Sequence, residues 1–162
     1  SKLHADIQVL MTENATNFIN PITFETLTGH KCLIDTFDRN FQYSVEHVSL
    51  AKKADVVLVA PASANVIGKI ANGIADTSVT MAVKAHLRNQ KPVLLAVSTN
   101  DGLGTAAKNI GTLLNCKNLY FLPFSQDDYI KKPNSLVADF EKLPDAAIAA
   151  FEGRQLQPVL GF

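Results

Sequence analysis

Hydrophobic residues along this chain gather in short continuous runs that are separated by stretches with helical spacing. Four runs are typical of buried strands, at residues 7–11, 56–60, 92–98 and 119–124, and residues 32–35 form a weaker fifth. Because these runs do not alternate between apolar and polar positions, each predicted strand has apolar neighbours on both of its faces. The pattern therefore indicates a parallel sheet that is covered by helices on both sides.

Helical spacing fills the intervals between the runs. It covers residues 21–27, 45–53, 65–71, 77–88, 105–114 and 145–151. Strands that alternate with helices predict an α/β fold, a Rossmann-like (flavodoxin-like) doubly wound parallel sheet with three layers and right-handed crossovers. Gly73 is expected to end one helix and Asp76 to cap the next. The polar stretch at residues 125–135 is expected to be a surface loop.

The start of the pattern differs from that of a complete doubly wound sheet, which opens with a strand, a turn and a helix. Here the chain enters what looks like the second strand at once, at residues 7–11. We therefore expect the first strand–helix unit to be missing, by truncation or by disorder, together with its ligand contacts. With 162 residues and 47% hydrophobic content, residues 1–162 are expected to form a single domain with one core.

Charge and cysteine content narrow the classes of partner. Lys plus Arg and Asp plus Glu both number 15, so the formal net charge is zero and no basic surface for nucleic acid is indicated. No apolar run has the length that a membrane span needs, and no apolar signal segment opens the chain. Cys32 and Cys116 lie far apart without CxxC spacing, which fits a reducing compartment. We expect a cytoplasmic protein whose partners are small molecules or other protein chains.

The end of one predicted strand carries the most informative stretch, which runs from Pro61 to Asn65. In open α/β sheets, ligands bind beyond the carboxyl ends of the strands. Pro61 has no N–H for a ladder and is expected to end the strand, and the small side chains of Ala62, Ser63 and Ala64 would let a planar ring approach the backbone. Asn65 can cap the next helix or offer a donor and an acceptor to a heterocycle. The alternative is an ordinary turn whose small residues serve packing.

The stretch APASANVIGKIANGIAD resembles the signature of the homo-oligomeric flavin-containing cysteine decarboxylases, the family of phosphopantothenoylcysteine decarboxylase and the lantibiotic peptide decarboxylases. The resemblance extends upstream through VLMTENATNFINPITFETLTG and VEHVSLAKKADVVLVAPASAN, so that it covers residues 9–83. It implies FMN as the cofactor, and a homo-oligomer built from trimers. The residues that it implies at the FMN site are Thr12 near the phosphate, Ala62, Ser63, Ala64, Asn65 and, close by, Ser78.

The same resemblance implies oxidative decarboxylation of a thiol acid. The flavin takes a hydride from the carbon beside a thiolate, and the resulting thioaldehyde lets carbon dioxide leave. His47 stands at the position of the family's active-site histidine and would act as a base or a positioning group, because imidazole titrates near neutral pH. A helix-surface histidine without a role is the alternative. The resemblance implies FMN, and the residues themselves do not distinguish FMN from FAD.

The second half departs from the decarboxylase pattern. Where that family carries Pro-x-Met-Asn, this chain reads AVSTNDGLGTAAKNIG. Only Asn100 falls near the motif's asparagine, and it is the second candidate catalytic residue. The family's cysteine-containing flap also has no counterpart, because Cys116 does not fit it. Residues 76–160 resemble instead the B subunits of dipicolinate synthase, through DTSVTMAVKAHLRNQKPVLLAVSTNDGLG and LYFLPFSQDDYIKKPNSLVADFEKLPDAAIAAFEGRQLQPVL. The alternative function is therefore a partner subunit in dipicolinate synthesis that performs no flavin redox step. Either reading implies a thiol acid or another carboxylate as the small-molecule ligand.

The sequence gives less support to a dinucleotide site, a metal site or a serine hydrolase. The stretch GLGTAA at residues 102–107 mimics a dinucleotide fingerprint, but no acidic residue follows at the end of the next predicted strand. Thr99, Asn100 and Asp101 can cap the helix that follows or face an anion such as a substrate carboxylate. The histidines are too widely spaced for a metal site, and Ser63 lies in no GxSxG elbow.

Overall fold

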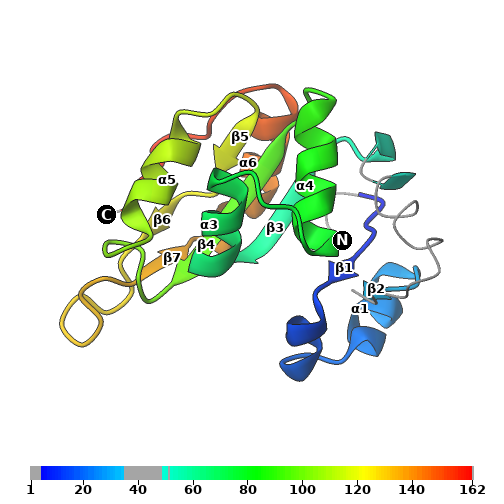
Figure 1. Ribbon diagram of the computed structural model, residues 1–162, viewed down its shortest axis with the longest axis horizontal. Helices are drawn as coiled ribbons and strands as arrows, with labels where there is room; N and C mark the ends of the chain where they lie inside the picture. The colour runs from blue at the N-terminus through cyan, green and yellow to red at the C-terminus, as the bar shows by residue number, and fades with distance from the viewer. Residues whose placement is uncertain (1–4, 35–48, 51, 162) are drawn as a thin grey trace.

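A parallel sheet forms the centre of the molecule in the computed structural model, which describes residues 5–34, 49–50 and 52–161 (Figure 1). Its three parallel strands are β3 (Val57–Ala62), β4 (Val93–Thr99) and β5 (Leu119–Phe121). β4 lies in the middle, with β3 and β5 hydrogen-bonded to its two sides. β4 confirms the prediction of a strand buried on both faces, since Val93 to Val97 are buried. β3 forms the predicted strand but has exposed residues, among them Leu58 at 41%.

The sheet continues with two short antiparallel strands, the first of which begins at Phe124, the last residue of the strand predicted at 119–124. β7 (Leu136–Ala138) pairs with the last residues of β4, and β6 (Phe124–Ser125) pairs with β7. The sequence pattern does not indicate this antiparallel pairing, because strands of two and three residues are too short to show a period. Residues 126–135 form the expected loop between β6 and β7.

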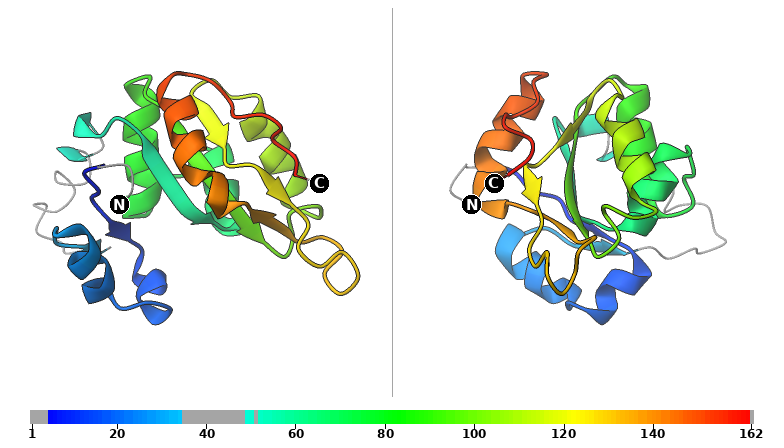
Figure 2. Two further views of the ribbon diagram at one scale, coloured as in Figure 1. Left: turned by 180° about the vertical axis from the view of Figure 1, so that it is seen from behind. Right: turned by 90° about the vertical axis from the view of Figure 1, so that its left-hand side faces the viewer.

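Helices cover both faces of the sheet and complete the three predicted layers (Figure 2). On one face lie α3 (Ala64–Ala71), α4 (Ser78–Arg88) and α5 (Ala107–Leu114). On the other lies α6 (Leu143–Phe151), which follows a short 3₁₀ turn, η2 (Phe140–Lys142). The Rossmann-like α/β class is therefore confirmed, with a sheet that is mostly parallel.

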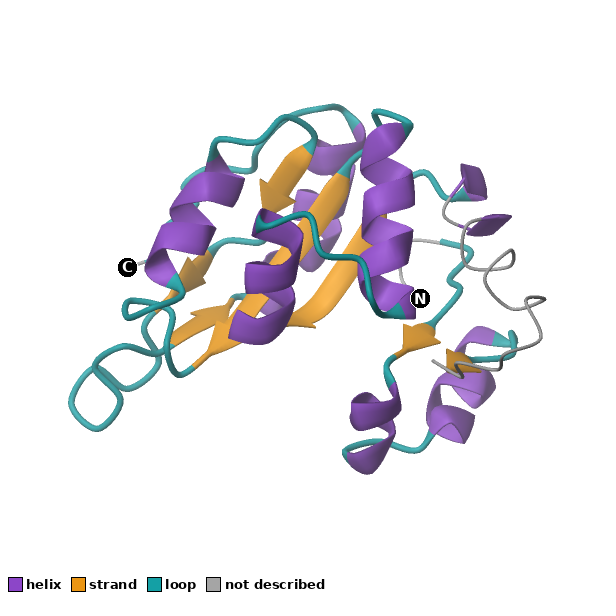
Figure 3. Ribbon diagram, in the orientation of Figure 1, coloured by secondary structure: helices purple, strands orange, loops and turns teal. Residues whose placement is uncertain are grey.

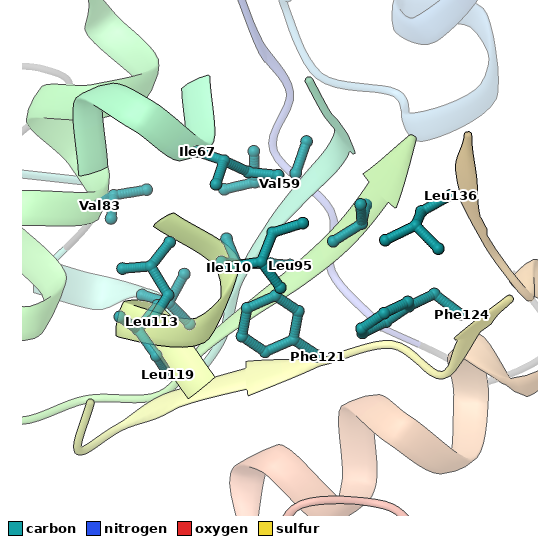
Figure 4. Close-up of a cluster of buried hydrophobic side chains, with 13 residues drawn as sticks. Val59, Ile67, Val83, Leu95, Ile110, Leu113, Leu119, Phe121, Phe124 and Leu136 are labelled. Atoms are coloured by element: carbon teal, nitrogen blue, oxygen red, sulfur yellow. The ribbon is translucent and has the colours of Figure 1, made fainter. Parts of the chain in front are cut away.

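The main core lies between the sheet and α3 to α5 (Figure 4). Ile67, Leu95 and Phe121 are completely covered there, and the rings of Phe121 and Phe124 meet at a tilted angle with centroids 5.9 Å apart. On the opposite face the buried side chains that α6 adds to the core are the small residues Ala146 and Ala150, with Leu143 and Ala147 partly buried beside them. Small side chains let this helix lie close to the strands.

The helix caps differ in part from those predicted. Gly73 follows the α3 C-cap with φ +69°, the left-handed conformation expected of a glycine at a helix end. Asp76 does not cap α4, since Thr77 does so in a reciprocal capping box with Thr80, and Asp76 pairs instead with Lys69, Nζ to Oδ1 2.9 Å. Neighbouring residues that can all cap cannot be ranked from sequence alone, because the backbone turn decides which one is used.

The N-terminal segment forms a second, two-stranded parallel sheet of β1 (Leu10–Met11) and β2 (Leu33–Ile34). Between its strands lie a 3₁₀ helix, η1 (Glu13–Asn17), and α1 (Pro21–Thr28). Leu10 packs against α4, so the small sheet is attached to the body by that helix. In the described part of the chain, no helix is long and apolar enough to cross a bilayer.

Candidate functional site

The predicted site residues follow strands that end at one edge of the molecule. β1, β3 and β4 run in the same direction, and η1, α3 and α4 begin at the edge where these strands end (Figure 3). Thr12 follows β1, Ser63 follows β3 and Asn100 follows β4. The fold therefore brings segments that are far apart in sequence to the carboxyl edge of the strands, where α/β proteins bind ligands.

The turn after β3 presents small side chains and backbone at this edge. β3 does not end at Pro61, as expected, but runs on to Ala62 through a register shift against β4. A proline fits here because β3 is an edge strand of its sheet, where an N–H is not needed on the outer side. Pro61 is exposed, whereas Ala62 is completely covered by the main core. Ala62, a predicted FMN-site residue, is therefore covered by the protein itself and is not exposed at this edge.

Ser63, not Asn65, caps α3. The Ser63 hydroxyl oxygen accepts a hydrogen bond from the Val66 N–H at 3.4 Å. Ala64 is half-buried and Asn65 is exposed in the first turn of the helix. Within the described residues the Asn65 side chain makes no hydrogen bond, so its amide can donate to and accept from a ligand. This arrangement suits the edge of a planar heterocycle.

Two further predicted FMN-site residues differ in exposure. Thr12 is half-buried, and its hydroxyl oxygen accepts the Ala15 N–H at 3.2 Å, so that it caps η1 while its hydroxyl hydrogen can still donate. Ser78 is completely buried in the first turn of α4. Its side chain therefore supports the helix that lies beside the edge and does not face solvent.

Of the two predicted catalytic residues, the structure describes Asn100 but not His47. Asn100 is exposed, directly after β4. Because Ala62 lies opposite Val97, Asn100 extends about 10 Å beyond the end of β3 at the usual rise of a strand. His47 lies outside the described residues, as does most of the helix expected at residues 45–53. His47 therefore stays a prediction.

The carboxylate of Asp101 closes the loop after β4 through two hydrogen bonds. Asp101 accepts the Thr105 N–H at 3.1 Å through one oxygen and the Ala106 N–H at 3.2 Å through the other. These amides open the segment that leads into α5, so the position where an external anion could bind is already occupied by a negative charge. Asp101 does not cap α5, whose N-cap is Ala106 without a side-chain hydrogen bond; it closes the turn that leads into that helix.

The two glycines of the apparent dinucleotide fingerprint have packing roles. A Cβ atom on Gly102 would lie 2.6 Å from Leu136 Cγ, and one on Gly104 would overlap the Asp101 carboxylate. The Leu103 N–H also donates to the Asn134 carbonyl at 2.9 Å. The loop is thus fixed against β7, a contact that nothing in the sequence pattern indicated. These contacts explain the glycines without a nucleotide.

Titratable groups with shifted pKa values occur at Cys32 and Asp127. Burial, and to a smaller extent the nearby Glu25 carboxylate, raise the pKa of the Cys32 thiol. A hydrogen bond from Ser135 is the main cause that lowers the pKa of Asp127 in the 126–135 loop. Among the described residues, no three His, Cys, Asp or Glu side chains are grouped so that they could hold a metal ion. The described site therefore offers neutral polar groups and backbone.

Known proteins resemble this chain over most of its length. The model of the Flavoprotein family matches residues 1–140. The B subunit of dipicolinate synthase from Bacillus subtilis is 46% identical over 136 residues, which are 84% of this chain and 65% of that protein. The chain therefore spans about two thirds of that relative's length.

Solved structures show the same two resemblances. The crystal structure of the dipicolinate synthase B subunit from Bacillus halodurans has a TM-score of 0.75 at 33% identity, and the match covers 98% of this chain and 97% of that one. The FMN-dependent cysteine decarboxylase SpaF has a TM-score of 0.65 at 28% identity, over 89% of this chain and 79% of SpaF. Both family resemblances expected from the sequence are thus confirmed. This chain belongs to the Flavoprotein family.

Proposed function

We propose that this protein binds FMN at the carboxyl edge of β1 and β3 and acts as the flavin-binding subunit of a dipicolinate-synthase-type enzyme. The observation that carries the proposal is the turn after β3, which combines an exposed Pro61, small residues and an Asn65 amide without a hydrogen bond in the described part of the chain. These residues fit a flavin, because its flat ring needs room against backbone and its edge needs donors and acceptors. The match to FMN-dependent SpaF supports FMN over FAD.

Each residue of the edge has a role in this proposal. Thr12 donates its hydroxyl hydrogen to the phosphate, the backbone of Ser63 and Ala64 lines the ring, and Asn65 bonds to the ring's edge. Asn100 bonds to a substrate carboxylate beyond the end of β4, and His47 holds or moves a proton. When bound, the flavin supplies hydride acceptance. Loss of hydride is the step that an aromatic dicarboxylate such as dipicolinate needs when it forms from a non-aromatic precursor.

The loop after β4 favours this function over decarboxylation. It lacks the Pro-x-Met-Asn pattern, and Asp101 and Gly102 fix it in a closed form against β7. The B subunits of dipicolinate synthase also match a larger share of this chain than SpaF does in structure. A cytoplasmic location and a dicarboxylate ligand follow from the same proposal.

Oxidative decarboxylation of a cysteine-type thiol acid is the second candidate, supported by the turn after β3 and by the similarity to SpaF. Two substrate assays separate the candidates. The FMN-loaded protein, with the partner subunit of the synthase added, would be given a dihydropyridine dicarboxylate and, separately, phosphopantothenoylcysteine. Formation of dipicolinate supports the first function, and release of carbon dioxide from the thiol acid supports the second. Protein that stays colourless with added FMN would refute both.

A homo-oligomer is part of the proposal. Large apolar side chains are exposed on the N-terminal segment, with Phe18 at 90% and Leu27 at 77%. Exposed apolar groups of this size, close together in sequence, are typical of surfaces that another chain covers. A trimer, or a multiple of trimers, is the expected state, and light scattering after gel filtration measures it. A monomer at micromolar concentration would contradict this part of the proposal.

A further inference from the structure

The loop between β6 and β7, residues 126–135, projects from the body and is held in shape by its own hydrogen bonds. Figure 1 and the left view of Figure 2 show it reaching out beyond the sheet and its helices. The Gln126 amide donates to the Pro133 carbonyl at 2.8 Å, and the Lys132 N–H donates to the Asp128 carbonyl at 2.8 Å. Because the loop is ordered before any partner binds, a contact that uses it costs little conformational entropy.

The base of this loop is joined firmly to the body. Asn134 accepts the Leu103 N–H from the loop after β4 at 2.9 Å. Ser135 is buried, its N–H donates to the Lys132 carbonyl at 3.0 Å, and its side chain is hydrogen-bonded to Asp127. The position of the loop tip is therefore fixed relative to the sheet.

The tip carries two large side chains that the body does not cover. Tyr129 is 70% exposed and Ile130 is 79% exposed. The chain turns here because the Lys131 N–H donates to the Asp128 carboxylate at 3.0 Å. An aromatic and an aliphatic side chain at the end of an ordered loop are typical of a surface that another protein chain covers.

The charges beside the tip indicate which chain this is. The sequence around the tip is Asp127-Asp128-Tyr129-Ile130-Lys131-Lys132, so two acidic residues precede the apolar pair and two basic residues follow it. In a twofold contact, residue i of one copy meets residue j of the other, and j meets i. Two copies of this loop that meet tip to tip therefore place each acidic arm opposite a basic arm. A loop with a single sign of charge would repel its own copy.

We propose that the tip of the 126–135 loop docks onto the same loop of a second copy of this chain, around a twofold axis between Tyr129 and Ile130. Tyr129 of each copy packs on Ile130 of the other, and Asp128 lies opposite Lys131. This contact differs from those within a trimer, which are related by a threefold axis. The inference thus goes beyond the homo-oligomer proposed above and holds for a single chain as well as for a trimer.

The small size of the contact sets its strength. Four side chains cover less surface than the roughly 1,000 Å² that is typical of a stable dimer. We therefore expect weak pairing between single chains, and stronger pairing where several loops of one oligomer act together. Because part of the contact is electrostatic and exposed, added salt should weaken it.

Analytical ultracentrifugation over a series of protein concentrations tests the apolar part of the contact. Tyr129→Ala combined with Ile130→Ala should raise the dissociation constant of the pairing about tenfold or more, and halve the mass where the parent is paired. The control combines Ile148→Ala with Phe151→Ala, which removes one exposed aliphatic and one exposed aromatic side chain from α6 and should change neither value. The mass ratio is two whether the pairing unit is a monomer or a trimer, so failure of the trimer would not hide the result.

A charge exchange tests the twofold geometry. Lys131→Glu and Asp128→Lys should each prevent pairing, because like charges then face each other in both halves of the contact. An equal mixture of these two variants should pair again, since every opposed pair in the mixed dimer has opposite charges. Lys131→Gln keeps the Asp128 acceptor at the tip and should weaken pairing less than Lys131→Glu.

Three results would overturn the inference. The first is a parent chain whose mass the tip variant leaves unchanged. The second is a mixture that stays unpaired although both charge variants keep the circular dichroism of the parent. The third is a tip variant that weakens FMN binding at unchanged mass, which would assign the loop to the ligand edge of its own chain.

Discussion

The packing of Gly102 against Leu136 gives a prediction whose size can be worked out from the structure. A Cβ atom at Gly102 would lie 2.6 Å from two atoms of Leu136 and 2.7 Å from a third, closer than packed carbon atoms approach. Gly102 is buried and Leu136 is 5% exposed, so neither group can move into solvent. Forcing one extra carbon into a packed core costs about 1–3 kcal/mol. We therefore expect Gly102→Ala to lower the free energy of unfolding by that amount.

The matched control is Gly111→Ala on α5. A Cβ atom there meets nothing within 4 Å, and the residue is exposed inside a helix. Replacing glycine by alanine in a helix interior stabilises by about 0.5–1 kcal/mol. Urea unfolding at 25 °C, followed by circular dichroism, measures both variants against the parent chain. If Gly102→Ala unfolds at the same urea concentration as the parent, the glycine is not there for packing, and nucleotide binding at this loop must be considered again.

The remaining predictions concern the loop after β4, the edge beside β5 and the two cysteines. Asp101→Ala should destabilise by about 1 kcal/mol, because the Thr105 and Ala106 amides lose their acceptor; an unchanged urea midpoint would contradict this. Gln155→Ala should destabilise by about 1–3 kcal/mol, since the Phe121 N–H and carbonyl lose their partner, and thermal unfolding measures the loss. At pH 8 a thiol reagent should modify the exposed Cys116 quickly and Cys32 only on unfolding, because burial covers the Cys32 thiol and raises its pKa. Equal rates for both thiols would show that β2 opens readily.

The raised pKa of Cys32 also makes the stability of the fold depend on pH in a definite direction. A group whose pKa is raised by folding stabilises the fold while it is protonated, and this contribution is lost as the pH rises from the unfolded value through the folded one. Cys32→Ala should therefore flatten the decline of stability above the ordinary thiol pKa of about 8.5. Urea unfolding at neutral and at alkaline pH, with Cys116→Ala as the control, tests the sign. A decline that only the control removes would contradict it.

Much of the fold could be predicted from the sequence because buried strands and amphipathic helices leave periods in it. The run at β4 is a clear case, since residues from Val93 to Val97 are buried on both faces. The antiparallel pair β6 and β7 could not be predicted, because two- and three-residue strands carry no period. Pro61 was expected to end β3, but an edge strand tolerates a residue without an N–H.

The candidate site was predictable in its place and less so in its details. A short run of small residues after an apolar strand indicates a ligand edge in any α/β fold, and the resemblance to flavin proteins supplied the cofactor. The sequence could not decide between Ser63 and Asn65 as the helix cap, since both types cap well and lie two positions apart. It also gave no sign that β7 fixes the loop after β4, because that contact joins residues more than thirty positions apart.

FMN affinity of the Asn65→Asp variant tests the central claim most directly. The substitution replaces an amide, which donates and accepts hydrogen bonds, by an anion that only accepts them. The loss of one hydrogen bond and repulsion from the flavin should weaken FMN binding about tenfold or more, which corresponds to about 1.4 kcal/mol. Asn115→Asp makes the same charge change on an exposed residue at the far end of α5 and should bind like the parent. Quenching of flavin fluorescence measures all three dissociation constants. Selective weakening in Asn65→Asp is the predicted result; equal affinity in both variants would contradict a flavin site at the turn after β3.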